Sequence, residues 1–189
     1  MAFTGQKIRN YPAHFGQASL AICSRNDDVA TMTIRFMQAL NYRGALDLGY
    51  RYDSRDGRYK VNDINPRIGA MFRCFVGKNG MDVARALYQE MTGQPVTASI
   101  TPIRRKWIVE DVDLVSAVRY YVDGKFTTRE LIDSFRGIDE AAYLARDDLG
   151  PFAGICLADA KQILGRLLGS RRRKFDSVIT GAPVDAVHR

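Results

Sequence analysis

Apolar positions alternate with polar ones in two short segments near the start of the chain, residues 2–9 and 17–24. Successive side chains of a strand point to opposite faces, so each segment predicts a β-strand. The spacing then changes over residues 29–40, where apolar residues recur every three or four positions, as in a helix. Asn26 or Asp27 can cap the first turn of that helix.

The alternating pattern returns over residues 44–65, around the turn SRDG, which predicts a β-hairpin. A three-residue loop, residues 55–57, is a common closure when its glycine adopts the left-handed conformation. That loop would pair Ser54 with Arg58. A loop with one residue fewer or more would shift every pair along the hairpin by one position.

Helical spacing resumes in residues 79–93, whereas residues 94–106 hold two prolines and suit a connector or an edge strand. Three further helices are predicted beyond residue 106; they lie in the segments 111–124, 127–137 and 157–169. The sequence therefore predicts an α+β fold in which an antiparallel sheet is flanked by helices. We expect one domain over residues 1–106 and a mostly helical extension with a basic tail over residues 107–189.

The composition is that of a globular protein, with 189 residues, 46% hydrophobic and 26% charged. No apolar run reaches the roughly 18 residues that a membrane span needs. The first dozen residues lack the apolar block of a secretory signal. Cys23, Cys74 and Cys156 are far apart and form no CxxC pair, which favours free thiols in a reducing cytoplasm over a zinc site.

The net charge of +7 raises the alternative of nucleic-acid binding. Residues 165–189 contain six basic and two acidic side chains, a net +4, so over half of the excess lies in the tail. A basic tail of this kind is more often a solvated end than a nucleic-acid site. The helix before it could also lie on a membrane surface, but its glycines favour a packed helix with a charged end.

The end of the hairpin carries the strongest chemical signal, in the stretch NDINPRIG. In the register of a three-residue loop, Gly49 lies opposite Asp63 and Asp47 lies opposite Asn65, all on one face. Two carboxylates and an amide are the oxygen ligands that suit Mg²⁺, and Arg67 suits an anion beside it. The alternative is structural: turn or edge residues, with Arg67 in a surface ion pair.

The order of these segments resembles the carboxy-terminal half of the ATP-grasp superfamily. The matching features are ALNYRGALDLGYRYD, the turn SRDG, the strand RYKVN and the signature DINPR, together with the upstream KIRNYPAHFGQAS. The resemblance covers residues 2–92. It is closest to the carboxylate–amine ligases related to the large subunit of carbamoyl-phosphate synthetase.

This resemblance implies an enzyme that uses ATP with Mg²⁺ or Mn²⁺ to convert a small carboxylate into an acyl phosphate, which an amine then attacks. Asp63 and Asn65 would be metal ligands, and Arg67 would steady the transferred phosphoryl group or the carboxylate. Arg9 and Arg73 are further candidates for phosphate binding, with packing or surface roles as the alternative.

The sequence departs from the family in three respects. The signature acid is usually Glu, whereas Asp63 is one methylene shorter. Many relatives carry an acid where this chain has Gly49, and Asp47 on the same face can substitute for it. The glycine-rich loop and lysines of the other ATP-grasp lobe are missing. We therefore expect a half-site that a second chain or a missing N-terminal segment completes, or alternatively an inactive half-domain that binds another protein.

Overall fold

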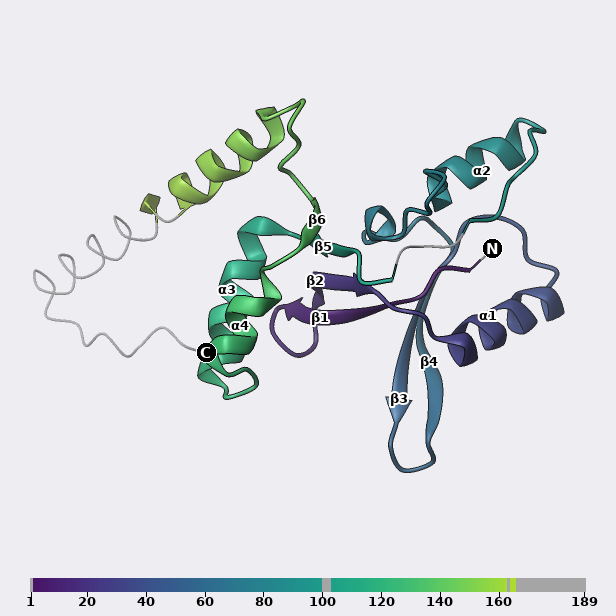
Figure 1. The fold of residues 1–189 in the computed structure, drawn as a ribbon, viewed down its shortest axis with the longest axis horizontal. Helices are drawn as coiled ribbons and strands as arrows, with labels where there is room; N and C mark the ends of the chain where they lie inside the picture. The colour runs from purple at the N-terminus through teal and green to yellow at the C-terminus, as the bar shows by residue number, and fades with distance from the viewer. Residues whose placement is uncertain (1, 100–102, 163, 166–189) are drawn as a thin grey trace, which may run out of the picture. The chain divides into compact units, whose positions relative to one another are not determined.

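The computed structural model describes residues 2–99, 103–162 and 164–165. The chain divides into two compact units, Met1–Ala142 and Tyr143–Arg189 (Figure 1). The sequence analysis placed a boundary near residue 106 instead. The first unit continues past that point because its four-stranded sheet uses strands from both sides of it.

The first unit contains two sheets, which are mostly antiparallel and agree with the predicted α+β class. The larger sheet has the strand order β1-β2-β5-β6, in which only β5 and β6 run parallel. The smaller sheet is the hairpin of β3 and β4. The strands are β1 (Gly5–Tyr11), β2 (Gln17–Cys23), β3 (Asp47–Asp53), β4 (Arg58–Asn65), β5 (Lys106–Ile108) and β6 (Ile138–Ala141). The sequence analysis missed β6.

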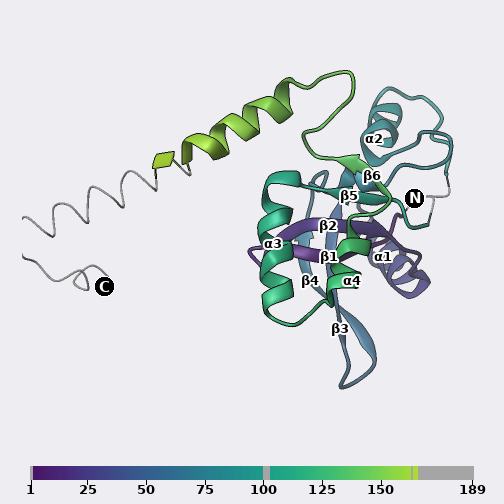
Figure 2. The same ribbon diagram turned by 60° about the vertical axis from the view of Figure 1, so that its left-hand side comes forward.

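The first helix begins at Asn26, one of the two capping residues that the sequence suggests. The Asn26 side chain accepts a hydrogen bond from the Val29 amide, and Thr127 and Glu130 form a capping box. The helices of the first unit are α1 (Asp27–Ala39), α2 (Val83–Met91), α3 (Glu110–Val122) and α4 (Thr128–Ser134), with a 3₁₀ turn η1 at Phe72–Cys74. Figure 2 shows α3 beside β1 and β2, which it contacts, with its axis running across the strands.

The apolar core lies between the larger sheet and η1. Its buried members are two alanines of β2, the thiols of Cys23 and Cys74, and Trp107 of β5. The Cys23 thiol donates a hydrogen bond to the carbonyl of Cys74, with 2.8 Å between sulfur and oxygen. All three cysteines of the chain are free thiols, as the sequence predicts, and Cys156 is exposed.

Lys106 of β5 fastens α4 to the sheet. Its ammonium donates to the carbonyls of Asp133, Ser134 and Arg136 at the end of α4, at 3.3, 3.2 and 2.6 Å. Burial lowers the pKa of Lys106, and the charge of Arg104 adds to this effect. These bonds satisfy carbonyls at the end of the helix, where the regular backbone pattern leaves acceptors free.

Replacing Lys106 by methionine is expected to lower the free energy of unfolding by about 1.5 kcal/mol. The substitution keeps most of the aliphatic stem but removes the charged donor from three carbonyls at the end of α4. Urea denaturation of the variant measures the loss. Lys78→Met, at an exposed lysine, is the matched control, and equal losses in both variants would contradict this role.

The second unit is described as far as residue 165 and is helical over residues 150–162. The Asp148 carboxylate accepts a hydrogen bond from the Gly150 amide at the start of this helix. The helix therefore begins before the predicted segment 157–169, whose last residues lie outside the described part, as does the basic tail. Within the described part of the chain, no helix has both the length and the apolar character needed to cross a membrane.

Candidate functional site at the end of the hairpin

The hairpin closes with a longer loop than the sequence predicts. Asp53 pairs with Arg58, so four residues form the loop instead of three. Such a loop would shift the register, but a bulge in β4 shifts it back. Asn62 is the extra residue, because Tyr50 pairs with Val61 and the next pair joins position 49 to position 63.

The bulge restores the predicted pairs at the far end of the hairpin. Gly49 pairs with Asp63, and Asp47 pairs with Asn65. Directly opposite residues share a face, as do residues two apart on one strand, so these four positions lie on the same face. The Asn65 amide donates a hydrogen bond to the Asp63 carboxylate, with 2.7 Å between Nδ2 and Oδ2. The predicted register at this end of the hairpin is therefore confirmed.

Gly49 leaves the space that the bulge needs. A Cβ atom at this position would lie 2.9 Å from Oδ1 of Asn62 and 3.1 Å from Cβ of Asp63. A side chain here would therefore force Asn62 to move. This contact gives a physical reason why the chain has glycine where many members of the resembling family carry an acid.

Arg67 follows the strand and turns back toward it. Its guanidinium lies 3.5 Å from Oδ1 of Asn65 and 3.3 Å from the carbonyl of Ile68, while the residue as a whole is exposed. Three other predicted site residues, Asp47, Asp63 and Asn65, lie on the hairpin itself. We use the name hairpin-end cluster for Asp47, Asp63, Asn65 and Arg67.

Gly69 holds the Asp47 side chain in place within this cluster. A Cβ atom at position 69 would overlap the Asp47 carboxyl carbon and would lie 2.6 Å from Oδ2 and 2.9 Å from Cβ. The backbone of residue 69 therefore packs directly on the Asp47 carboxylate. The loop after Arg67 thus returns to the first strand and encloses one side of the cluster.

Gly69→Ala is expected to displace the Asp47 carboxylate. Divalent-metal binding at the cluster should then weaken by about tenfold, which is typical of losing a residue that orients a metal ligand. The fold should survive, because the displaced side chain belongs to a half-exposed surface position. Gly154→Ala is the control, because a Cβ there meets nothing within 4 Å. Titration with Mn²⁺ compares the two variants, and unchanged binding in Gly69→Ala would show that Asp47 is not a ligand.

The donor set of the cluster fits a hard cation chemically, with two carboxylates, one amide oxygen and an adjacent guanidinium. Asn65 could offer Oδ1 to a metal while its Nδ2 keeps the bond to Asp63. The described residues contain no group of three or more His, Cys, Asp or Glu side chains that could hold a metal ion. Three protein oxygens leave positions open for water and phosphate, which is the usual situation of Mg²⁺.

Arg9 and Arg73, the other two predicted phosphate ligands, lie elsewhere. Arg9 is fully buried in β1 and pairs with Asp113 of α3, with Nη2 and Oδ2 2.5 Å apart. Arg73 pairs with Glu140 of β6 and also donates to the carbonyl of Ala142. In this conformation both guanidinium groups hold the fold together, so neither joins the hairpin-end cluster.

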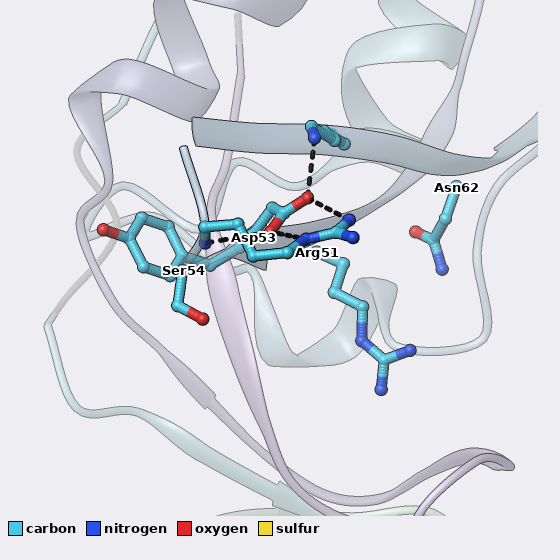
Figure 3. A pocket seen from close by; sticks show the side chains of 7 residues that line it. Arg51, Asp53, Ser54 and Asn62 are labelled. Carbon is cyan, nitrogen blue, oxygen red and sulfur yellow. Dashed lines mark hydrogen bonds and ion pairs between the residues drawn. The ribbon is translucent and has the colours of Figure 1, made fainter. Parts of the chain in front are cut away.

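A polar pocket at the opposite end of the hairpin was not foreseen from the sequence. It has a volume of about 420 Å³ and is shown in Figure 3. Asp53 accepts hydrogen bonds from Arg55 and Lys60, which hold the pKa of its carboxyl below the ordinary value. The Arg51 guanidinium extends away from Asp53 in this view. Its lining residues are Arg51, Tyr52, Asp53, Ser54, Arg55, Lys60 and Asn62.

The charged residues of the turn explain why this pocket exists. They also explain why the sequence gives only a weak indication of a binding site here. Positive charges from the loop and from β4 converge on one carboxylate, as they do in many solvated hairpin turns. The sequence stretch RYDSRDGRYK contains all of these charges, but its pattern does not distinguish a turn from a binding site. We assign no function to this pocket.

Comparison with known proteins gives one informative similarity. The chain is 30% identical over 79 residues to D-aspartate ligase of Enterococcus faecium (strain Aus0004). The match covers 42% of this chain and 18% of the ligase, so the chain spans less than a fifth of this relative. No family model and no solved structure matches the chain. The name of this relative states a ligase activity, and the similarity hints at a relationship to the ATP-grasp superfamily and its ATP-dependent ligases.

Proposed function

We propose that this chain supplies the metal- and phosphate-binding half of an ATP-dependent ligase that joins a carboxylate to an amine through an acyl phosphate. The observation that carries the proposal is the hairpin-end cluster, in which a β-bulge brings Asp47, Asp63 and Asn65 to one face beside Arg67. The similarity to D-aspartate ligase supports the reaction class.

Each residue of the cluster has a role in this proposal. Asp63 and Asn65 bind the cation, and Asp47 supplies a third oxygen from the opposite strand. Bound Mg²⁺ would neutralise charge on the phosphates of ATP. Arg67 contacts the phosphoryl group that is transferred, because its planar guanidinium can donate two parallel hydrogen bonds to it. Phosphoryl transfer mainly requires such positioning and charge neutralisation.

The name of the relative suggests a substrate class to test first. D-aspartate carries both carboxylates and an amine, which are the two kinds of reactant in this proposal. We therefore propose that one substrate of the complete enzyme is a small acidic amino acid. The second reactant would bring the complementary amine or carboxylate.

The proposal requires a second lobe to cover the nucleotide. Part of the surface around the hairpin is apolar and exposed, and no residue of α1 is fully buried. The exposed apolar side chains on these elements are Ile34, Tyr52, Val61 and Ile64. Tyr52, Val61 and Ile64 lie on the face of the hairpin opposite Asp63 and Asn65, so this apolar surface would contact a second chain or segment behind the cluster, whereas the lobe over the nucleotide would cover the cluster face.

Electron paramagnetic resonance of Mn²⁺ tests the metal site directly, because the signal of the free aqueous ion falls when the ion binds. We expect the whole chain, in the absence of ATP because ATP itself binds Mn²⁺, to bind Mn²⁺ and Asp63→Asn to lose this binding. Asp28→Asn is the matched control, because it removes an exposed carboxylate in the first turn of α1. Loss of binding in both variants, or in neither, would count against the proposal.

A further inference from the structure

Two of the three thiols of the chain meet in the apolar core of the first unit. Cys23 is the last residue of β2, and Cys74 is the last residue of η1. Their side chains are almost completely buried, with 2% and 0% of the residue surface exposed. The two sulfur atoms lie 3.8 Å apart, which is close to van der Waals contact. The third thiol, Cys156, is exposed and belongs to the second unit.

The 3₁₀ turn η1 can bring the two sulfur atoms within bonding distance. A disulfide bond is about 2.05 Å long, so the sulfur atoms would have to approach each other by about 1.8 Å. The amides of Phe72 and Cys74 donate to the carbonyls of Gly69 and Met71, at 3.1 and 2.9 Å, so these backbone bonds stay within the turn. The turn can therefore move toward β2 without breaking the pairs that β2 makes with its neighbouring strands.

The surroundings of the two thiols make them chemically unequal. The hydrogen bond with Cys23 lowers the pKa of the Cys74 thiol, and the positive charge of Arg105 adds to this effect, although burial opposes it. The same hydrogen bond and burial raise the pKa of Cys23. Peroxides react with the thiolate form of cysteine. Cys74 is therefore the expected site of attack, and Cys23 stands beside it as a protonated thiol.

A bond between these two residues would enclose the candidate functional site. Cys23 and Cys74 are 51 positions apart, and the chain between them contains α1, both strands of the hairpin and the hairpin-end cluster. Buried free cysteines often serve only as small apolar side chains. That role does not require two sulfur atoms in contact, and this contact is the observation that favours a reactive pair.

We propose that Cys23 and Cys74 form a redox switch, in which a hydroperoxide converts the two thiols into a disulfide and a small-molecule thiol restores them. Reversible disulfides in proteins of reducing compartments are usually catalytic or redox-sensing. A small uncharged oxidant such as hydrogen peroxide reaches the buried pair through local opening of η1.

The oxidation proceeds in two balanced steps. The Cys74 thiolate attacks one oxygen of hydrogen peroxide, the O–O bond breaks, and Cys74 becomes a sulfenic acid while hydroxide leaves. The Cys23 sulfur then attacks the Cys74 sulfur and loses its proton, and the S–O bond breaks with release of water. Hydroxide takes up the proton that Cys74 gave up when it became a thiolate. Two thiols thus lose two electrons, and one peroxide becomes two water molecules.

The disulfide should stabilise the first unit. It would close a ring around the hairpin and α1, and such a ring restricts the unfolded chain more than the folded one. We expect the melting temperature to rise by about 10 °C on oxidation. Addition of dithiothreitol should return the melting temperature to that of the reduced protein.

Peptide mapping of the whole chain tests the proposed bond. Cys156→Ser is the starting protein, because it removes the exposed thiol that could join two chains. After treatment with excess hydrogen peroxide and blocking of free thiols, trypsin should release the peptides 10–25 and 74–78 as one joined species. Dithiothreitol should separate them. Circular dichroism gives the melting temperature of the same samples before digestion.

A variant that keeps only one thiol of the pair is the matched control. Cys74→Ala, in the same Cys156→Ser protein, cannot form the bond, so peroxide should not raise its melting temperature. This control also measures any loss of stability that peroxide causes by oxidising methionines.

Three results would overturn the proposal. Cys23 and Cys74 could both remain thiols under conditions that oxidise Cys156 in the wild type. The joined peptides could form only when urea is present, which would show that the folded chain does not bring the thiols together. The oxidised protein could melt at or below the temperature of the reduced protein, whereas the Cys74→Ala control is unchanged by peroxide.

Discussion

Asp113→Ala is expected to lower the free energy of unfolding by about 3–5 kcal/mol, the largest stability change that we expect from a single substitution in this chain. The carboxylate of Asp113 is fully buried and accepts hydrogen bonds from Arg9 Nε at 3.0 Å, from Arg9 Nη2 at 2.5 Å and from the Ser19 hydroxyl at 2.8 Å. Removing it would leave the Arg9 guanidinium buried without a counter-charge.

The other neighbours of Arg9 would compensate little for the loss of the Asp113 carboxylate. Its guanidinium carbon lies 4.7 Å from the ring centroid of Phe135, and Nη1 donates to the Ser134 hydroxyl at 2.6 Å. A ring and a hydroxyl stabilise a buried cation by much less than a carboxylate does. Since these contacts join β1 to α3 and α4, we expect the whole first unit to lose stability.

Urea denaturation of three variants measures this effect: Asp113→Ala, Arg9→Met and the double variant. The double variant should lose much less stability than the sum of the two single losses, because neither charge is then left unpaired. Arg25→Ala, which breaks the exposed pair with Asp27, is the control and should change stability little. Additive losses in the double variant would show that the pair is not a coupled unit.

Arg67→Met is expected to weaken the binding of ATP by about 10- to 100-fold, the equivalent of one or two hydrogen bonds to a charged group. The proposal places this guanidinium on the phosphoryl group that is transferred. Binding of ADP, which lacks that group, should change much less. Arg67→Lys keeps the charge but not the planar pair of donors, so it should give an intermediate loss.

Competition between ATP and ADP for the chain, measured in the presence of Mg²⁺, separates these outcomes. An exposed arginine at the start of β4 provides the control, and Arg58→Met should leave the ratio of the two affinities unchanged. If Arg67→Met weakened the binding of ATP and of ADP equally, Arg67 would not contact the phosphoryl group that is transferred. Arg67 would then contact the phosphates that ATP and ADP share.

Local patterns predicted most elements of this fold correctly. The alternation around SRDG predicted the hairpin, and Asn26 was one of two predicted caps of α1, because both signals act between residues close in sequence. The parallel pairing of β5 with β6 was missed. The four residues of β6 carry almost no pattern of their own, and their pairing depends on a distant strand.

The candidate site was predicted from a hairpin loop length and a strand register, of which only the register was right. The expected loop length was wrong, and the expected register at Asp63 was correct because the bulge at Asn62 offsets the longer loop. Neither the longer loop nor the bulge could be seen in the sequence, since a bulge depends on packing across the hairpin. Arg9 was a candidate phosphate ligand with packing as one alternative, and its buried pair could not be foreseen because its partner, Asp113, is 104 positions away and resembles an ordinary first-turn acid.

Calorimetric titration of ATP into the whole chain, with and without Mg²⁺, tests the central claim that the hairpin end is a metal–phosphate site. The account predicts saturable binding by the wild type that requires Mg²⁺ and is lost in Asp63→Ala. Asp28→Asn should bind as the wild type does. An absence of binding by the wild type at millimolar ATP, or binding that Asp63→Ala shares, would contradict the claim.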